Sequence, residues 1–396
     1  MRDRFARTPT EVRTVSVAVA ASKREKASSK APEVRARSRR VRAQRSFMAV
    51  LSGLVMFVAV QLGLAAVVEI SMPELRDPVY GCRLDRVRRR LLTAPVKPWT
   101  VVMLGSSRTQ FAFRVGKGEE KAWTETLGHP VATFNFGVSG AGSLTELLTW
   151  SRLRRDGVRP NLLLVEVLPP LLNAQVPAQD YGEGFLPVNR LSWQNLPLVE
   201  RYEGTIRTNL RRDWLESSPV GCYAHRLNLI NLVMPDLLPP AYRRAGDEAL
   251  DDSDAPLAGE VRVTSEQRLR GIQFARKDYH RRLTGFRLGG QQCQALLDLL
   301  ASCRKEGVSV ALVLTPESPT FRSWYPLETW QGIQEWLTQV SQEYDAPLVN
   351  AREWIDDEED FMDSHHLLAS GRAKFTERLG RETILPLLRR PSLSSP

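Results

Sequence analysis

Two distant segments of the sequence carry polar residues that could together perform nucleophilic chemistry. Asp363 stands three residues before His366, just ahead of a segment with helical spacing, so its carboxylate can orient the imidazole. Near residue 100, a short apolar run leads into a small-residue turn that contains Ser106 and Ser107. A serine at the carboxyl end of a parallel strand faces the ligand-binding edge of the sheet, where an imidazole can take its proton. The pattern predicts a Ser-His-Asp site for acyl chemistry, with His365 as an alternative base.

A glycine-rich turn lies between these two segments in the chain. Residues 135–142 (Asn-Phe-Gly-Val-Ser-Gly-Ala-Gly) follow an apolar run and precede a segment with helical spacing. Exposed backbone N–H groups at such a turn could stabilise an oxyanion. Any strand-to-helix corner can use glycines, so the turn alone is weak evidence for an oxyanion site. The order of the motifs is the stronger evidence: serine turn, glycine turn, then Asp-x-x-His.

Alternating strand and helix patterns surround these motifs. We expect five strands, at residues 100–104, 131–136, 161–167, 308–314 and 347–350. We expect four helices, at residues 144–155, 291–306, 327–344 and 369–385. The third strand is almost wholly apolar, as in a sheet that is covered on both faces. The repeated order predicts an α/β fold, a three-layer doubly wound parallel sheet within residues 98–390.

The alternating pattern breaks down at about residues 174–288. This stretch contains the apolar run 227–233 and the acidic run 247–254. We expect a large, mostly helical insertion. A segment this long is usually a lid, a binding extension or a subdomain. A helical excursion that only packs on the core is the alternative.

The amino-terminal residues separate into a basic tail and an apolar run. Residues 1–46 carry 14 Lys and Arg against 4 Asp and Glu, which accounts for the whole formal net charge of +10. The tail has few residues that could form a core, so we expect it to be disordered. Residues 47–68 are 22 mostly apolar residues, long enough to cross a bilayer as one helix. The alternative is a signal peptide cleaved near residues 63–66.

Arginines cluster on the amino side of the apolar run. The positive-inside rule therefore puts the tail in the cytoplasm and the main domain outside the cell membrane. Residues 69–97 are expected to be a juxtamembrane connector. Because the basic charge adjoins a membrane span, we expect no nucleic-acid partner. The four cysteines lack the spacing of a metal or redox site, so no metal and no cofactor is expected, and free thiols are the default.

The order of the motifs resembles the SGNH/GDSL hydrolase superfamily, whose first block is Gly-Asp-Ser-Leu and whose last is Asp-x-x-His. The matching segments are residues 105–108 (Gly-Ser-Ser-Arg), 135–142 and 363–367 (Asp-Ser-His-His-Leu). A Gly-Ser-Ser opening on a membrane-anchored chain is similar to the envelope-facing branch, which includes D-alanyl transfer proteins and polysaccharide O-acyltransferases. The resemblance covers roughly residues 98–176 and 290–388.

The resemblance implies a role for each matching residue. Ser107 would be the nucleophile, His366 the general base, and Asp363 would hold the other ring nitrogen of His366. The oxyanion donors would be the backbone N–H groups of Ser107 and Gly140.

The third block of the family usually supplies an asparagine, and this chain departs from it. Residues 166–170 read Glu-Val-Leu-Pro-Pro. Either Arg108, Asn173 or another group substitutes for the missing donor, or the enzyme is slow or specialised for transfer. Glu166 is expected to be a structural carboxylate, paired with Arg108 or Arg114.

The resemblance implies a membrane-anchored serine esterase or O-acyltransferase that forms an acyl-enzyme. Its expected substrate is an acylated glycan of the cell envelope or a lipid-linked acyl group. The alternative is a catalytically degenerate protein with this fold that binds or assembles envelope components. The sequence leaves the oligomeric state open.

Overall fold

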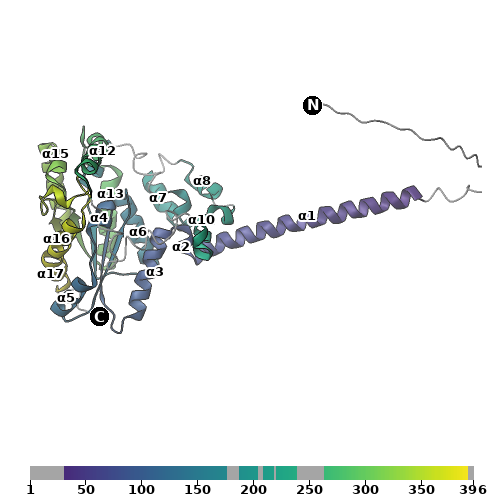
Figure 1. Ribbon diagram of the computed structural model, residues 1–396, viewed down its shortest axis with the longest axis horizontal. Coiled ribbons are helices and arrows are strands. Elements are labelled where there is room, and N and C mark those ends of the chain that lie inside the picture. The colour runs from purple at the N-terminus through teal and green to yellow at the C-terminus, as the bar shows by residue number, and fades with distance from the viewer. Residues whose placement is uncertain (1–30, 176–186, 204–207, 218–219, 239–262, 391–396) are drawn as a thin grey trace, which may run out of the picture. The chain divides into compact units, whose positions relative to one another are not determined.

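The structure is a computed structural model that describes residues 31–175, 187–203, 208–217, 220–238 and 263–390. The chain divides into two compact units, residues 1–60 and residues 61–396. The second unit holds the α/β domain (Figure 1).

The centre of the domain is a five-stranded parallel sheet with the strand order β2-β1-β3-β4-β5. Its strands are β1 (Trp99–Gly105), β2 (Val131–Gly137), β3 (Leu162–Glu166), β4 (Ser309–Leu314) and β5 (Leu348–Asn350). The order reverses between β1 and β3, the type of position where doubly wound sheets bind ligands. The predicted fold class is therefore confirmed, and every predicted strand ends within two residues of its observed bounds.

Two apolar layers cover the two faces of the sheet. The bounding helices are α5 (Lys117–Leu127), α6 (Ser143–Arg155), α13 (Gly290–Glu306), α15 (Leu327–Tyr344) and α16 (Ala369–Leu379). Val102 and Leu104 of β1 pack into one core with α6, α13 and α15. Val101 and Met103 pack into the other core with α5 and α16. Alternate side chains of one strand thus enter opposite cores, which explains why the strands are apolar throughout.

The predicted closing helix has three parts in the structure. After α16, the chain continues as a π-helix (Gly380–Ile384) and then as α17 (Leu385–Leu388).

The described part of the insertion is mostly helical. It contains η3 (Val188–Arg190), η4 (Trp193–Asn195), α7 (Leu196–Glu203), α8 (Leu210–Ser217), α9 (Gly221–Ala224), α10 (Arg226–Val233), η5 (Pro235–Leu237) and α12 (Ser265–Leu283). The acidic run 247–254 lies outside the described residues.

Residues 69–97 were predicted to be a connector, but in the structure they are part of the folded domain. They fold into α2 (Pro73–Arg76) and α3 (Pro78–Thr93), and α3 buries Tyr80, Leu84 and Val87 against the domain core. Asp77 caps α3 and Pro78 occupies its first turn, where a missing N–H costs nothing.

Helix α1 (Ala31–Ile70) contains the apolar run. Among the described residues, Arg39–Ile70 is the one helix long and apolar enough to cross a membrane. The helix begins at Ala31, within the segment 1–46 that was expected to be disordered. Ala, Arg and Gln are good helix formers, so the helix of the apolar run can extend toward the amino terminus through residues of these types. Residues 1–30 lie outside the described residues.

Candidate active site

Ser107 lies where the sheet reverses its strand order. β1 ends at Gly105, and Ser107 is the first residue of α4 (Ser107–Ala112). Ser106 is extended and caps this helix, since its Oγ accepts a hydrogen bond from the backbone N of Arg108 at 3.1 Å. The turn therefore fixes the backbone on both sides of Ser107.

A buried carboxylate holds this turn in place. Glu166, at the end of β3, accepts hydrogen bonds from the backbone N of Ser106 at 2.6 Å and from its Oγ at 3.1 Å. The hydroxyls of Thr109 and Thr315 also donate to Glu166, at 2.8 and 3.1 Å. A Cβ at Gly105 would lie 2.4 Å from Glu166 Oε2, so the close approach requires glycine. Glu166 is thus a structural carboxylate in this geometry.

The predicted pairing of Glu166 with Arg108 is wrong. Arg108 pairs with Glu317 at 2.8 Å instead. Each carboxylate oxygen of Glu166 accepts two of the hydrogen bonds from the hydroxyl and backbone donors of the turn and its neighbours. These donors satisfy the carboxylate, which explains how it is buried without that guanidinium.

His366 lies on a closed loop beside Ser107. Phe361 and Leu367 form an antiparallel bridge, and the backbone N of Met362 donates to the carbonyl of His366 at 2.8 Å. His366 Nε2 lies 2.7 Å from Ser107 Oγ. The structure therefore brings together residues separated by 259 positions in the sequence.

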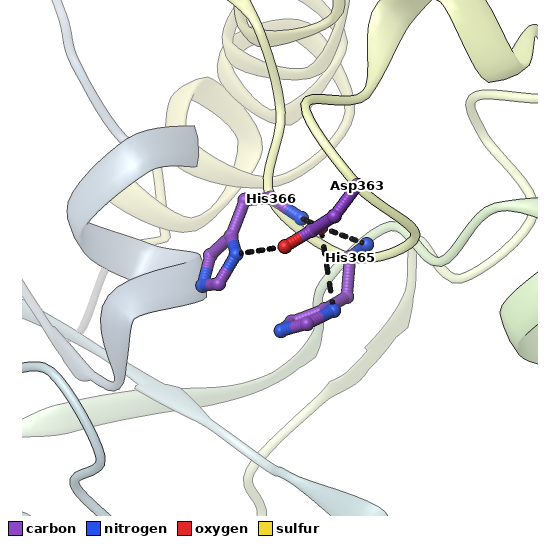
Figure 2. A group of neighbouring side chains, drawn as sticks. All are labelled: Asp363, His365 and His366. Carbon is purple, nitrogen blue, oxygen red and sulfur yellow. Dashed lines mark hydrogen bonds and ion pairs between the residues drawn. The ribbon is translucent and has the colours of Figure 1, made fainter. Parts of the chain in front are cut away.

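Asp363 orients the imidazole of His366 (Figure 2). Its Oδ2 lies 2.8 Å from His366 Nδ1, while its Oδ1 accepts the backbone N–H groups of His365 and His366 at 2.8 and 2.9 Å. Because an ionised carboxylate only accepts hydrogen bonds, Nδ1 carries the proton and Nε2 is left as an acceptor facing Ser107. This is the tautomer that a general base requires.

The environment keeps Asp363 ionised. Burial disfavours its charged form, but the hydrogen bond from His366, the neighbouring imidazoles and the backbone N–H of His365 outweigh burial. Together they hold the pKa of Asp363 well below its ordinary value.

His365, the alternative base, points elsewhere. Its ring packs against Tyr279 and Phe321, with centroid distances of 5.2 and 5.5 Å. Its Nδ1 lies 3.4 Å from Ser364 Oγ and 3.4 Å from Asp363 Oδ1. Burial, followed by the proximity of His366, holds the pKa of His365 well below its ordinary value, so the ring is neutral at neutral pH.

The two expected oxyanion donors lie on neighbouring turns. The turn after β2 is tied to the turn after β1, because the backbone N of Val138 donates to the carbonyl of Gly105 at 2.8 Å. Gly140 has a φ of 73°, a left-handed conformation that favours glycine. Within the part of the chain that the structure describes, neither Ser107 N nor Gly140 N has a hydrogen-bond acceptor.

Asn173 and Arg108, the expected substitutes for the missing asparagine, both make other contacts in the structure. The Asn173 amide group donates to the carbonyl of Arg282 at 2.8 Å and accepts from the backbone N of Gln175 and of Arg287, both at 3.0 Å. Arg108 is buried and stacks over the ring of Phe321 at 4.5 Å. The Asn173 amide is thus engaged by the scaffold, whereas Nε and Nη2 of Arg108 have no hydrogen-bond partner among the described residues.

Sequence reasoning missed the part that α12 plays beside the site. Arg268 of α12 donates to the carbonyl of Phe361 at 3.0 Å and pairs with Glu359. A Cβ at Gly271 would lie 2.9 Å from that of Asp363. The signal was present in the sequence, because Thr264 and Gln267 form a capping box at the start of the helix.

Three side chains of the site could also hold a metal ion. Asp363, His365 and His366 each offer a ligand atom, and these atoms lie within 4.8 Å of one another (Figure 2). The donor set suits zinc or another transition metal. A metal there would displace the proton that joins His366 to Asp363, so it would compete with general-base chemistry.

The chain was compared with protein-family models, curated proteins and solved structures. One protein-family model, which has no descriptive name, matches residues 287–387. No curated protein matches the chain. Among solved structures, the chain is similar to a mutant of Axe2, an acetyl-xylooligosaccharide esterase from Geobacillus stearmophilus, at 11% identity and a TM-score of 0.31. The match covers 72% of this chain and 93% of that one. A TM-score at this level assigns neither a family nor an activity.

Proposed function

We propose that the protein is a serine esterase or O-acyltransferase in which Ser107, His366 and Asp363 form the catalytic triad. The hydrogen-bonded chain from Ser107 Oγ through His366 to Asp363 carries this proposal. His366 Nε2 takes the hydroxyl proton as Ser107 Oγ attacks an ester or thioester carbonyl. Asp363 stabilises the imidazolium that forms.

The tetrahedral intermediate then collapses to an acyl-enzyme. The C–O or C–S bond to the leaving group breaks, and His366 returns its proton to that group. Water or an acceptor hydroxyl attacks the acyl-enzyme with His366 again as base, and Ser107 recovers its proton. The backbone N–H groups of Ser107 and Gly140 stabilise the oxyanion in both halves of the reaction. No cofactor takes part in these steps.

We also propose that residues 47–68 anchor the chain in the cell membrane, with the tail 1–46 in the cytoplasm and the domain 98–390 outside. The apolar composition of Arg39–Ile70 and the arginines before it support this orientation. A tethered domain meets substrates at the membrane surface, so acylated envelope glycans or lipid-linked acyl groups are the substrate class that we propose.

A fluorophosphonate probe tests the triad. Wild-type protein should be labelled on Ser107, because the probe requires an activated serine. Ser107→Ala and His366→Ala should abolish labelling. Ser106→Ala is the matched control: it removes the neighbouring hydroxyl, which caps the helix and donates to Glu166, at a cost of about 1–3 kcal/mol in stability, and should still be labelled. Folded wild-type protein that resists the probe would instead favour a binding or assembly role.

A further inference from the structure

Helix α10 is mostly apolar, yet the described protein covers it only in part. Five of its eight residues are Leu, Ile or Val, and none of the eight is buried. The apolar surface continues beyond the helix, where the exposed fractions of Met234 and Leu237 are 53% and 68%. The other three residues of α10 are Arg226, Asn228 and Asn231, so the apolar side chains cover only part of the helix surface. An exposed apolar surface of this kind normally contacts a partner protein, a ligand or a membrane.

The adjoining helix α9 packs against the last turns of the apolar run in α1. The backbone N of Cys222 donates to Gln61 Oε1 at 3.0 Å, and Gln61 Nε2 donates to Cys222 Sγ at 3.3 Å. A Cβ at Gly221 would lie 3.4 Å from the backbone N of Ala65. Residues 221–222 thus satisfy the one amide side chain inside the apolar run, as expected of a polar group within a membrane.

A cavity lined by charged side chains lies at the carboxyl end of α1. The cavity has a volume of about 320 Å³, and Glu69, Arg76, Arg152, Arg155 and Asp156 are among its lining residues. Gln61 precedes Glu69 by eight residues, which is about 12 Å along a helix axis. Along α1, the contact with α9 therefore lies on the side of the apolar run, away from the charged cavity.

We infer that residues 220–237 are embedded in the membrane leaflet next to the α/β domain, with lipid acyl chains covering their apolar side chains. This inference rests on the proposed anchoring of residues 47–68. Arg226 stacks over the ring of Tyr223 at 4.0 Å, and such a pair can reach the headgroups from an embedded helix.

The embedded segment limits how the domain moves on its anchor. Asn228 Nδ2 donates to the carbonyl of Leu75 at 2.7 Å and so ties α10 to α2. With both α1 and residues 220–237 in the lipid, the domain is held at two points of the membrane surface. This favours substrates that are themselves attached to, or close to, that surface.

Cysteine accessibility in the full-length protein tests this inference. Val233→Cys and Leu237→Cys are placed in protein reconstituted in lipid nanodiscs, and a charged thiol reagent is followed by peptide mass spectrometry. Leu327→Cys is the water-facing control, since Leu327 is 70% exposed and Val233 is 69% exposed. Val55→Cys reports on the anchor. Positions 233, 237 and 55 should react at least tenfold more slowly than position 327.

The outcomes separate the inference from the anchoring on which it rests. Reaction at 233 and 237 as fast as at 327, with position 55 protected, would overturn the inference and leave the anchor intact. Fast reaction at position 55 as well would overturn both. An NBD fluorophore attached to the thiol of the Val233→Cys variant should be quenched by lipids with doxyl-labelled chains and not by iodide. Protection without doxyl quenching would mean that protein covers the segment, which also overturns the inference.

Discussion

Replacing Asp363 with Asn should abolish most activity and leave the fold nearly intact. The amide oxygen of Asn can still accept the backbone N–H groups of His365 and His366, which Asp363 Oδ1 now accepts at 2.8 and 2.9 Å. The amide nitrogen, however, would face His366 Nδ1 and donate to it. The proton of His366 would then move to Nε2, toward Ser107, and the ring could no longer act as a base.

The magnitude follows from the cost of the wrong tautomer. In serine proteases this change lowers kcat by about 10⁴-fold, and a loss of 10³ to 10⁴ corresponds to about 4 to 5.5 kcal/mol in the activation barrier. The assay is steady-state hydrolysis of p-nitrophenyl acetate, with thermal unfolding measured in parallel. Asp356→Asn is the control, because it removes an exposed carboxylate that pairs with Arg322 away from the triad. If Asp363→Asn keeps activity within tenfold of wild type, Asp363 does not orient the base.

Three further perturbations follow from the same geometry. Gly105→Ala should lower the thermal midpoint, because its Cβ would lie 2.4 Å from Glu166 Oε2 and overpacking costs about 1–3 kcal/mol; an unchanged midpoint would contradict the close approach. Buried His365 has a depressed pKa, so the unfolded state takes up its proton first, and stability should fall by about 1.4 kcal/mol per unit as pH drops below about 6.5. Denaturant unfolding at pH 7 and pH 5.5 should show a smaller loss for His365→Gln, and equal losses would refute a neutral His365. EDTA should leave ester hydrolysis unchanged while excess zinc inhibits it through Asp363 and His366, and loss of activity on chelation would indicate a metal enzyme.

The sequence predicted the sheet because strongly apolar runs and helical spacings are local signals. Ser107, Asp363 and His366 also stood out by type and spacing, and the structure brings their side chains within hydrogen-bonding distance. The sequence also predicted a structural role for Glu166, but it did not predict the hydrogen-bond partners of this carboxylate. Its partners include the hydroxyl of Thr315, 149 residues away, and nothing near Glu166 in the sequence signals that contact.

The high arginine content of residues 83–90 also led to a wrong prediction for helix α3, which is part of the core. The arginines of residues 83–90 suggested a basic connector, although the same segment carries the apolar stripe of α3, with Tyr80, Leu84 and Val87 buried. An arginine-rich helix can bury one face and expose its charges on the other, so charge density alone was misleading. The short apolar run 227–233 likewise read as an ordinary part of the insertion.

Trapping the acyl-enzyme tests the central claim most directly. The protein is mixed with p-nitrophenyl acetate, quenched in acid during turnover, digested and examined by peptide mass spectrometry. The proposed mechanism predicts one acetyl group on Ser107 in the wild-type protein and in Ser106→Ala. Turnover with the acetyl group on another residue, or with no acetylated peptide under conditions where deacylation is slow, would contradict it.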